Sequence, residues 1–229
     1  MKIKFPWFTV FCAATAWGLH QVPATAPALE FDRAAMARGE LWRALTAHFV
    51  HFNANHLYWD LLGLLLLGCW AELISRRAWL VAFLVSSAAI SISVWALQPH
   101  LLTYRGLSGV ACVPLGLIIV HLLRTARRER DPAGAGVAMA GSLLFLGKTL
   151  YETVSGRAIF VEAGDTFAAV PLAHLAGFLT GATVGAVTPS ARSPDRPDAG
   201  CNTRGHLRET PPGWRFRWPR GRENACPGR

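Results

Sequence analysis

The sequence predicts an all-α membrane protein of six transmembrane helices, followed by a disordered basic tail. Of its 229 residues, 52% are apolar and only 16% are charged, whereas a soluble domain usually carries about 25% charged residues. Six apolar stretches approach the roughly 20 residues that a helix needs to cross a bilayer. The formal net charge is +9, and much of it lies in residues 189–229, which hold nine arginines against four acids.

The six apolar stretches are separated by short polar connections. They cover residues 5–22, 48–71, 78–97, 107–123, 133–150 and 167–187. Lysine and arginine are enriched in the cytoplasmic loops of membrane proteins. Basic residues precede the first stretch and follow the second, fourth and sixth, whereas the alternate loops carry little net positive charge. We therefore expect both termini in the cytoplasm, and spans two, four and six entering the membrane from its outer face.

The first stretch also has the layout of a signal peptide. Lys2 and Lys4 precede the apolar run, and Ala24-Thr25-Ala26 offers a cleavage site. Cleavage there would leave the remaining five spans in the same orientation. The predictions below hold for either form.

The chain is expected to divide into a membrane domain, residues 1–188, and a tail, residues 189–229. The tail holds seven of the 14 prolines and no apolar periodicity, a composition that cannot offset the entropy lost on folding. Its segment 213–222 alternates aromatic residues with arginines. Such a segment suits anionic lipid headgroups or single-stranded nucleic acid. At a cytoplasmic membrane face we expect the lipid bilayer as its partner, and no nucleic acid.

Span four opens with a candidate nucleophile, Ser108, flanked by Gly106 and Gly109. The glycines allow a tight backbone at a helix start, where free N–H groups and the helix dipole favour developing negative charge. Span four has only 17 apolar residues, about 25 Å of helix, so we expect its start to lie below the membrane surface. The alternative is that Ser108 is a plain helix N-cap.

Span six carries a candidate base, His174, and the motif Gly177-x-x-x-Gly181. The span is expected to begin near Phe167, which places His174 about 10 Å along the helix. The two glycines let two membrane helices approach closely, and so bring the histidine toward Ser108. The alternative for His174 is a bridging hydrogen bond between helices.

Span two begins with three histidines, His48, His51 and His56, and an acid, Asp60. His56 and Asp60 are four residues apart and so share one face of a helix. The alternative is a zinc site formed by the three histidines, but no cysteine or glutamate completes an evident set of ligands. The five cysteines show no C-x-x-C spacing. We expect neither metal nor cofactor.

Taken together, these segments resemble the rhomboid intramembrane serine proteases, and within them the compact bacterial branch called rhombosortase. The resemblance covers residues 39 to about 185. It rests on Gly39-Glu-Leu-Trp-Arg43, Thr46-Ala-His-Phe-Val-His51, His56-x-x-x-Asp60, Gly106-Leu-Ser-Gly109, Gly147-Lys-Thr-Leu-Tyr-Glu152 and Ala173-His-x-x-Gly177. The segment from Lys148 to Glu152 favours the rhombosortase branch over general rhomboids.

The resemblance implies six helices around a water-filled cavity and hydrolysis of a peptide bond by a Ser108–His174 dyad. It assigns the oxyanion hole to the Ser108 N–H, His56 and the position of Asp60. It also implies membrane-anchored substrates whose C-terminal anchor begins with Gly-Gly, and a location in the bacterial inner membrane with the site opening to the periplasm. A catalytically inactive binding protein and a transporter are the alternatives.

Two residues depart from the family. Asp60 stands where rhomboids usually have asparagine, and Cys112 replaces an aromatic residue that often stacks on the catalytic histidine. An ionised Asp60 accepts hydrogen bonds but cannot donate them, so we expect it to orient His56. A protonated Asp60 would instead donate directly, as asparagine does.

Overall fold

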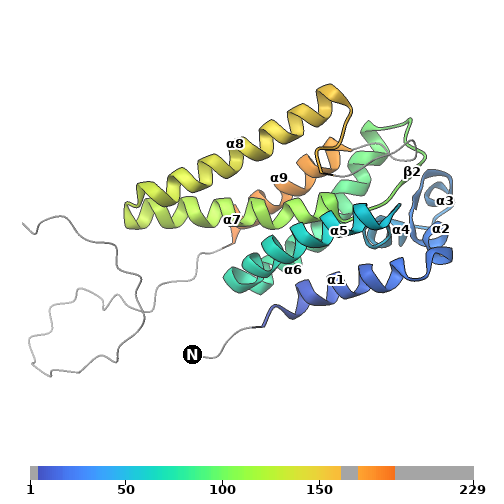
Figure 1. Cartoon of the computed structure of the whole chain (residues 1–229), viewed down its shortest axis with the longest axis horizontal. Helices are drawn as coiled ribbons and strands as arrows, with labels where there is room; N and C mark the ends of the chain where they lie inside the picture. Colours follow the sequence, from blue (N-terminus) through green and yellow to red (C-terminus); the bar gives the residue numbers. More distant parts are fainter. Residues whose placement is uncertain (1–4, 161–169, 189–229) are drawn as a thin grey trace, which may run out of the picture. The chain divides into compact units, whose positions relative to one another are not determined.

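A computed structural model describes residues 5–160 and 170–188, which lie within one compact unit, Met1–Ser190 (Figure 1). Helices make up most of this part of the chain. In order, the elements are α1 (Trp7–His20), η1 (Pro23–Thr25), α2 (Ala26–Leu29), β1 (Phe31–Asp32), α3 (Arg33–Ala37), α4 (Arg43–Thr46), η2 (Ala47–Phe49), α5 (Ala54–Gly63), η3 (Leu64–Gly68), α6 (Cys69–Leu97), β2 (Thr103–Tyr104), α7 (Ser108–Glu129), α8 (Pro132–Ser155) and α9 (Pro171–Val187).

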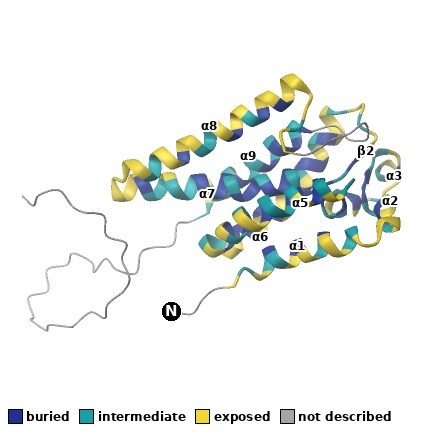
Figure 2. Ribbon diagram, viewed as in Figure 1, coloured by how far each residue is buried: buried dark blue, intermediate teal, exposed yellow. Residues whose placement is uncertain are grey.

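Helix α7 is the centre of the bundle. It packs most extensively on α9, and also on α6, α8 and the π-helical turn η3. Its inward side chains, among them Val110, Val113 and Ile118, are buried. Helix α8 is the opposite case, since most of its surface is exposed along its whole length (Figure 2). The core therefore forms around α7, and α8 attaches to it from one side.

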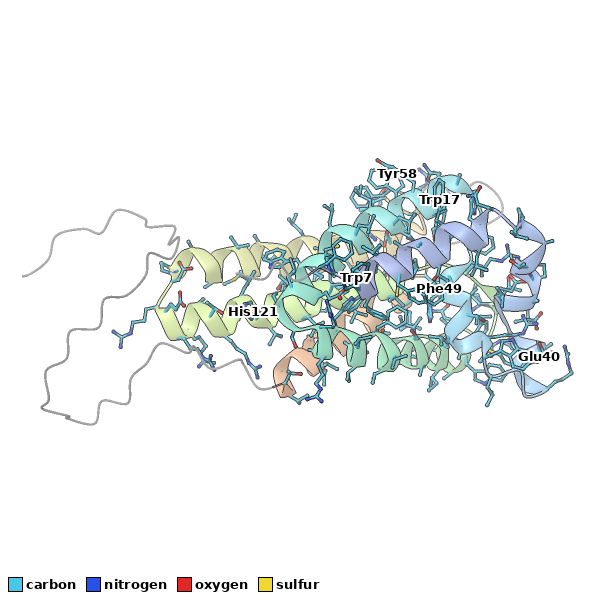
Figure 3. All side chains as sticks on the ribbon, turned by 90° about the horizontal axis from the view of Figure 1, so that it is seen from below. Trp7, Trp17, Glu40, Phe49, Tyr58 and His121 are labelled. Atoms are coloured by element: carbon cyan, nitrogen blue, oxygen red, sulfur yellow. The ribbon has the colours of Figure 1, made fainter. Side chains whose placement is uncertain are left out.

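Within residues 5–160 and 170–188, three helical stretches are long and apolar enough to cross a membrane: Ala54–Leu97, Ser108–Glu129 and Pro132–Ser155. Helix α9 is apolar but shorter, and α1 has only 14 residues. Large apolar and aromatic side chains such as Trp7, Trp17 and Tyr58 are exposed on the outside (Figure 3), where a bilayer would cover them. The count of six membrane-crossing helices stays a prediction.

Most of predicted spans two and three lies in one helical stretch, Ala54–Leu97, whose helical backbone is interrupted at Ser75. This residue has extended angles, φ −158° and ψ 98°, and its hydroxyl accepts a hydrogen bond from the N–H of Ala78 at 3.3 Å. A serine in this conformation caps the helix that follows it. The break lies between the two predicted spans, so the chain can reverse there.

Helix α1 is fixed to α6 by a buried carboxylate. Glu72 accepts hydrogen bonds from the N–H groups of Phe8 and Thr9, at 3.2 and 2.8 Å, and from the Thr9 hydroxyl at 2.9 Å. Arg76 pairs with the same carboxylate at 2.9 Å. Unpaired N–H groups at a helix start attract anions. Glu72 therefore serves as the N-terminal cap of α1.

The short elements between α1 and α5 hold the segment that precedes α7. Strand β1 pairs antiparallel with β2, with Phe31 opposite Tyr104. The Arg33 guanidinium donates hydrogen bonds to four carbonyl oxygens at the end of α6 and just beyond it, those of Val94, Trp95, Gln98 and Leu101. In Figure 1, α5, α7 and α9 all begin at the end of the bundle where these short elements lie. The starts of α5, α7 and α9, which carry the candidate site, therefore lie at the same end of the bundle.

Two helix boundaries differ from the prediction. Helix α7 continues to Glu129, because alanine and arginine sustain a helix beyond the apolar run, and it ends at Arg130 with φ 55°. Its 22 residues remove the length argument for a buried start. Helix α9 begins at Pro171, a residue favoured in the first turn, so His174 lies in that turn and not 10 Å along the helix. Phe167 and the predicted tail, residues 189–229, lie outside the described residues.

Candidate active site

Ser108 is the first residue of α7, and Leu107 occupies the N-cap position. The alternative that Ser108 is the N-cap is therefore wrong. The preceding turn needs glycine, because Gly106 has φ 122° and a β-carbon there would lie 2.6 Å from the His56 ring. Its N–H donates to the Ala47 carbonyl at 3.1 Å. The backbone before Ser108 is therefore fixed against His56.

His174 lies next to the closest approach of α9 and α7. A β-carbon built on Gly177 would come 1.9 Å from the carbonyl oxygen of Gly109, and one on Gly181 would come 2.0 Å from that of Val113. A β-carbon on Gly109 would also lie 3.0 Å from the carbonyl oxygen of Ala173, which is one turn before Gly177 on α9. The predicted glycine contact between spans four and six is confirmed. It places the residues adjoining Ser108 and His174 in direct backbone contact.

Ser108 and His174 line one cavity of about 370 Å³. His174 is 7% exposed, and Ser108 is half-buried. His56 and Asp60 line the same cavity, as do apolar residues of α5 and η3 such as Leu66. The structure therefore brings together the four side chains that the sequence suggested for catalysis. An apolar cavity with a few polar groups is the usual form of a binding site.

Asp60 connects two histidines at the back of this cavity. Its Oδ2 atom lies 3.2 Å from Nε2 of His56 and 3.1 Å from Nε2 of His51. The shared helical face of His56 and Asp60 is confirmed. His51 also lies beside His56, and the two rings are 5.1 Å apart in a T-shaped arrangement. His51 precedes α5 in an irregular turn, where helical spacing does not apply.

His48 faces away from His51 and His56. Its Nε2 atom lies 3.2 Å from the carbonyl oxygen of Ser87 on α6, and its ring contacts Tyr104. Among the residues that the structure describes, no group of three or more His, Cys, Asp and Glu side chains is arranged to hold a metal ion. The zinc alternative, which needs His48 together with His51 and His56, therefore lacks structural support.

Glu152 is a site residue to which sequence reasoning gave no role. Its Oε2 atom lies 3.2 Å from Nδ1 of His174 and 2.7 Å from Nζ of Lys148. Glu152 is 2% exposed, although α8 is otherwise mostly exposed. Lys148 and Glu152 stood out in the sequence only as a motif, four residues apart on one helix. No local signal joins them to His174, 22 residues further along the chain.

Two further side chains border Ser108. The Cys112 thiol lies 3.2 Å from the Ser108 carbonyl oxygen, one turn along α7. Tyr104 is the last residue of strand β2, and its hydroxyl donates to the carbonyl of Gly106 at 3.4 Å. Burial raises the pKa of the Tyr104 phenol. The hydroxyl therefore stays protonated and remains a hydrogen-bond donor beside Ser108.

Comparison with known proteins assigns the chain to a family. A search of curated proteins gave no match. The family model of the Rhomboid domain matches residues 38–191, which is more than half of the 229 residues. The matched region contains α4 to α9 and every candidate site residue named above. The chain therefore belongs to the rhomboid family of membrane proteins, whose members are generally intramembrane serine proteases that act on membrane proteins.

Proposed function

We propose that this protein is an intramembrane serine endopeptidase that uses Ser108 as nucleophile and His174 as base. The observation that carries the proposal is the shared cavity of the two residues, at the point where the backbones of α7 and α9 touch. Nucleophilic catalysis requires a hydroxyl beside a base that accepts its proton. A cavity whose exposed surface is mainly apolar suits a transmembrane segment as substrate.

In the proposed reaction, the Ser108 hydroxyl attacks the carbonyl carbon of the scissile peptide bond. His174 accepts the hydroxyl proton and passes it to the leaving amine as the C–N bond breaks. Water then attacks the acyl-enzyme ester, losing its proton to His174, and releases the new carboxyl terminus. Ser108 recovers its proton from His174. Each step needs only groups that line the cavity.

The negative charge of the tetrahedral intermediate needs hydrogen-bond donors that are already in place. We assign this task to the Ser108 N–H and to His56. Ser108 is the first residue of α7, so its N–H belongs to the free donors of the helix start and benefits from the helix dipole. Gly106, packed on the His56 ring, fixes the distance between the two donors.

Asp60 is assigned an orienting role in this oxyanion hole. One carboxylate oxygen that contacts two Nε2 atoms is best satisfied when it is ionised and accepts hydrogen bonds from both rings. Asp60 then orients His56 and stabilises its doubly protonated ring, whose Nε2–H donates to the carboxylate and whose Nδ1–H is left to donate to the oxyanion. His51 completes the arrangement by holding the carboxylate from its other side.

The proposed substrates are exported proteins whose C-terminal membrane anchor begins with Gly-Gly. This proposal rests on the resemblance to rhombosortases, in particular on the segment from Lys148 to Glu152. We place the protein in the bacterial inner membrane, with both termini cytoplasmic. The starts of α5, α7 and α9, where the cavity lies, would then open to the periplasm.

Labelling with a fluorophosphonate probe in detergent tests the catalytic proposal without knowledge of the substrate. Only an activated serine reacts with this probe, so wild type should label and Ser108→Ala should not. Ser93→Ala, which changes a hydroxyl bonded to its own helix at Ala89, is the matched control and should label like wild type. A wild-type protein that stays unlabelled would favour the inactive binding protein instead.

A further inference from the structure

A carboxylate on α8 contacts the proposed base from the side opposite to its reacting nitrogen. Glu152 Oε2 lies 3.2 Å from Nδ1 of His174. A carboxylate at this distance accepts a hydrogen bond from the Nδ1–H group. The neutral ring then carries its lone pair on Nε2, the nitrogen left to receive the Ser108 proton.

Both oxygens of the Glu152 carboxylate have hydrogen-bond partners. Lys148, one turn earlier on α8, lies 2.7 Å from Oε2, and Oε1 accepts the N–H of Ile159 at 3.2 Å. A buried carboxylate is costly unless it is paired and hydrogen-bonded. Lys148 and Ile159 therefore hold Glu152 ionised and at a fixed height beside His174.

The position of this carboxylate is unusual for the helix that carries it. Helix α8 exposes most of its surface, yet Glu152 is 2% exposed and lines the same cavity as Ser108. Ionisable groups at membrane depth are expensive and usually mark a functional site. If α8 only needed to pack on α9, an apolar residue would do so at less cost.

We propose that Glu152 is a positioning residue that completes a Ser108–His174–Glu152 triad, with Lys148 holding the carboxylate in place. The proposal rests on the protease function proposed above and adds a third member to its dyad. Glu152 fixes the tautomer of His174 and stabilises the imidazolium that forms when Ser108 loses its proton. The proton stays on the imidazole throughout, and the carboxylate remains ionised.

Other charged and titratable groups also face His174 and Glu152. Helix α7 contributes Cys112, the segment before it Tyr104 and Arg105, and α5 contributes His56 and Asp60 across the cavity. Among the described residues that line the cavity, Glu152 lies within hydrogen-bond distance of the His174 ring, with its Oε2 atom 3.2 Å from Nδ1. Removing its charge should therefore act directly on the His174 imidazolium that forms during the reaction, while the groups across the cavity stay the same in each variant below.

The test is the rate of fluorophosphonate labelling of the full-length protein in detergent, measured across a pH series from about 5 to 9. Glu152→Gln should slow labelling at neutral pH by at least about tenfold; the corresponding change in a well-studied serine protease triad costs about 10⁴-fold. The acidic limb of the curve that relates its labelling rate to pH should move to lower pH, because the imidazolium loses the neighbouring negative charge. Glu152→Asp keeps the charge and should recover part of the rate.

Lys148→Gln supplies a shift in the opposite direction. Without the lysine, the Glu152 carboxylate attracts the imidazolium proton more strongly, so the acidic limb should move to higher pH. Damage to packing does not move this limb in opposite directions in two variants of one ion pair. This variant and Glu152→Asp also carry the test if Glu152→Gln does not accumulate in the membrane.

Glu72→Gln is the matched control, because Glu72 is also a buried carboxylate paired with a basic residue one turn away. It should lower the melting temperature and leave the acidic limb unchanged. An acidic limb in Glu152→Gln or Lys148→Gln that coincides with that of wild type would overturn the triad, whatever the change in rate. If Ser108→Ala labels as well as wild type, the protease proposal fails as well; if only the triad is wrong, labelling still depends on Ser108.

Discussion

The backbone of Gly177 in α9 packs directly on the carbonyl of Gly109 in α7, with no room for a side chain between them. Gly177→Leu should therefore force the two helices apart, at a cost of about 1–3 kcal/mol typical of overpacking, and lower the labelling rate of Ser108 at least about tenfold. Gly136→Leu is the control, since space is open around Gly136 on α8. Equal rates in the two variants would mean that this contact does not set the site geometry.

Ser108→Ala and His174→Ala should each abolish cleavage of a reporter with a Gly-Gly anchor, while both proteins still accumulate in the membrane. Removing either member of a coupled nucleophile and base costs nearly as much as removing both. The double variant should therefore be no less active than the single ones. Substantial cleavage by Ser108→Ala would refute the assignment of the nucleophile.

Asp60→Asn should lower activity at neutral pH. The substituted amide keeps an oxygen that His51 and His56 can both contact, but it carries no negative charge, so the charge-assisted hydrogen bonds from both rings weaken. The loss should stay below the roughly 10²–10³-fold effect of removing an oxyanion donor outright. If Asp60 instead acts as a protonated donor, Asn would keep the activity and extend it to higher pH. A pH profile of reporter cleavage by wild type and mutant distinguishes the two roles.

Truncation after Thr188 should preserve catalysis. The proposed site lies at the helix starts, and α9 ends at Val187, at the other end of the bundle (Figure 1). Removal of residues 189–229 also takes away the aromatic and basic segment 213–222, so binding to vesicles with anionic lipids should weaken. Reporter cleavage and vesicle sedimentation measure the two effects separately. Loss of all activity in a stably inserted truncated protein would contradict this view of the tail.

The parts of the site that follow helical spacing were predictable from the sequence. His56 and Asp60 share a face because they are one turn apart, and Gly177 and Gly181 form one contact surface for the same reason. The helix start at Ser108 agrees with the predicted opening of span four, whereas the start at Pro171 was not predicted, although proline is favoured in a first helical turn. The predicted features depend on local geometry, and the sequence contains all of it.

The features that escaped prediction depend on long-range packing or on irregular backbone. His51 meets Asp60 through the turn before α5, which has no fixed periodicity. Glu152 meets His174 across 22 residues and two helices. The continuation of α7 to Glu129 has another cause, since helix propensity continues after the apolar run ends. Apolar length locates a span but does not locate the end of its helix.

The contact between Glu72 and α1 means that the folded unit extends beyond the region that the family model matches. The match to the family begins at residue 38, so a fragment cut at that point lacks α1 and β1. Glu72 would then lose the Phe8 and Thr9 donors and remain as a carboxylate on an uncovered face of α6. Strand β2, which leads into Ser108, would lose its only described partner strand. Designs that graft or minimise this protein should therefore start no later than residue 5, because α1 holds α6 through Glu72 and β1 holds the strand that leads into Ser108, and both lie before the matched region.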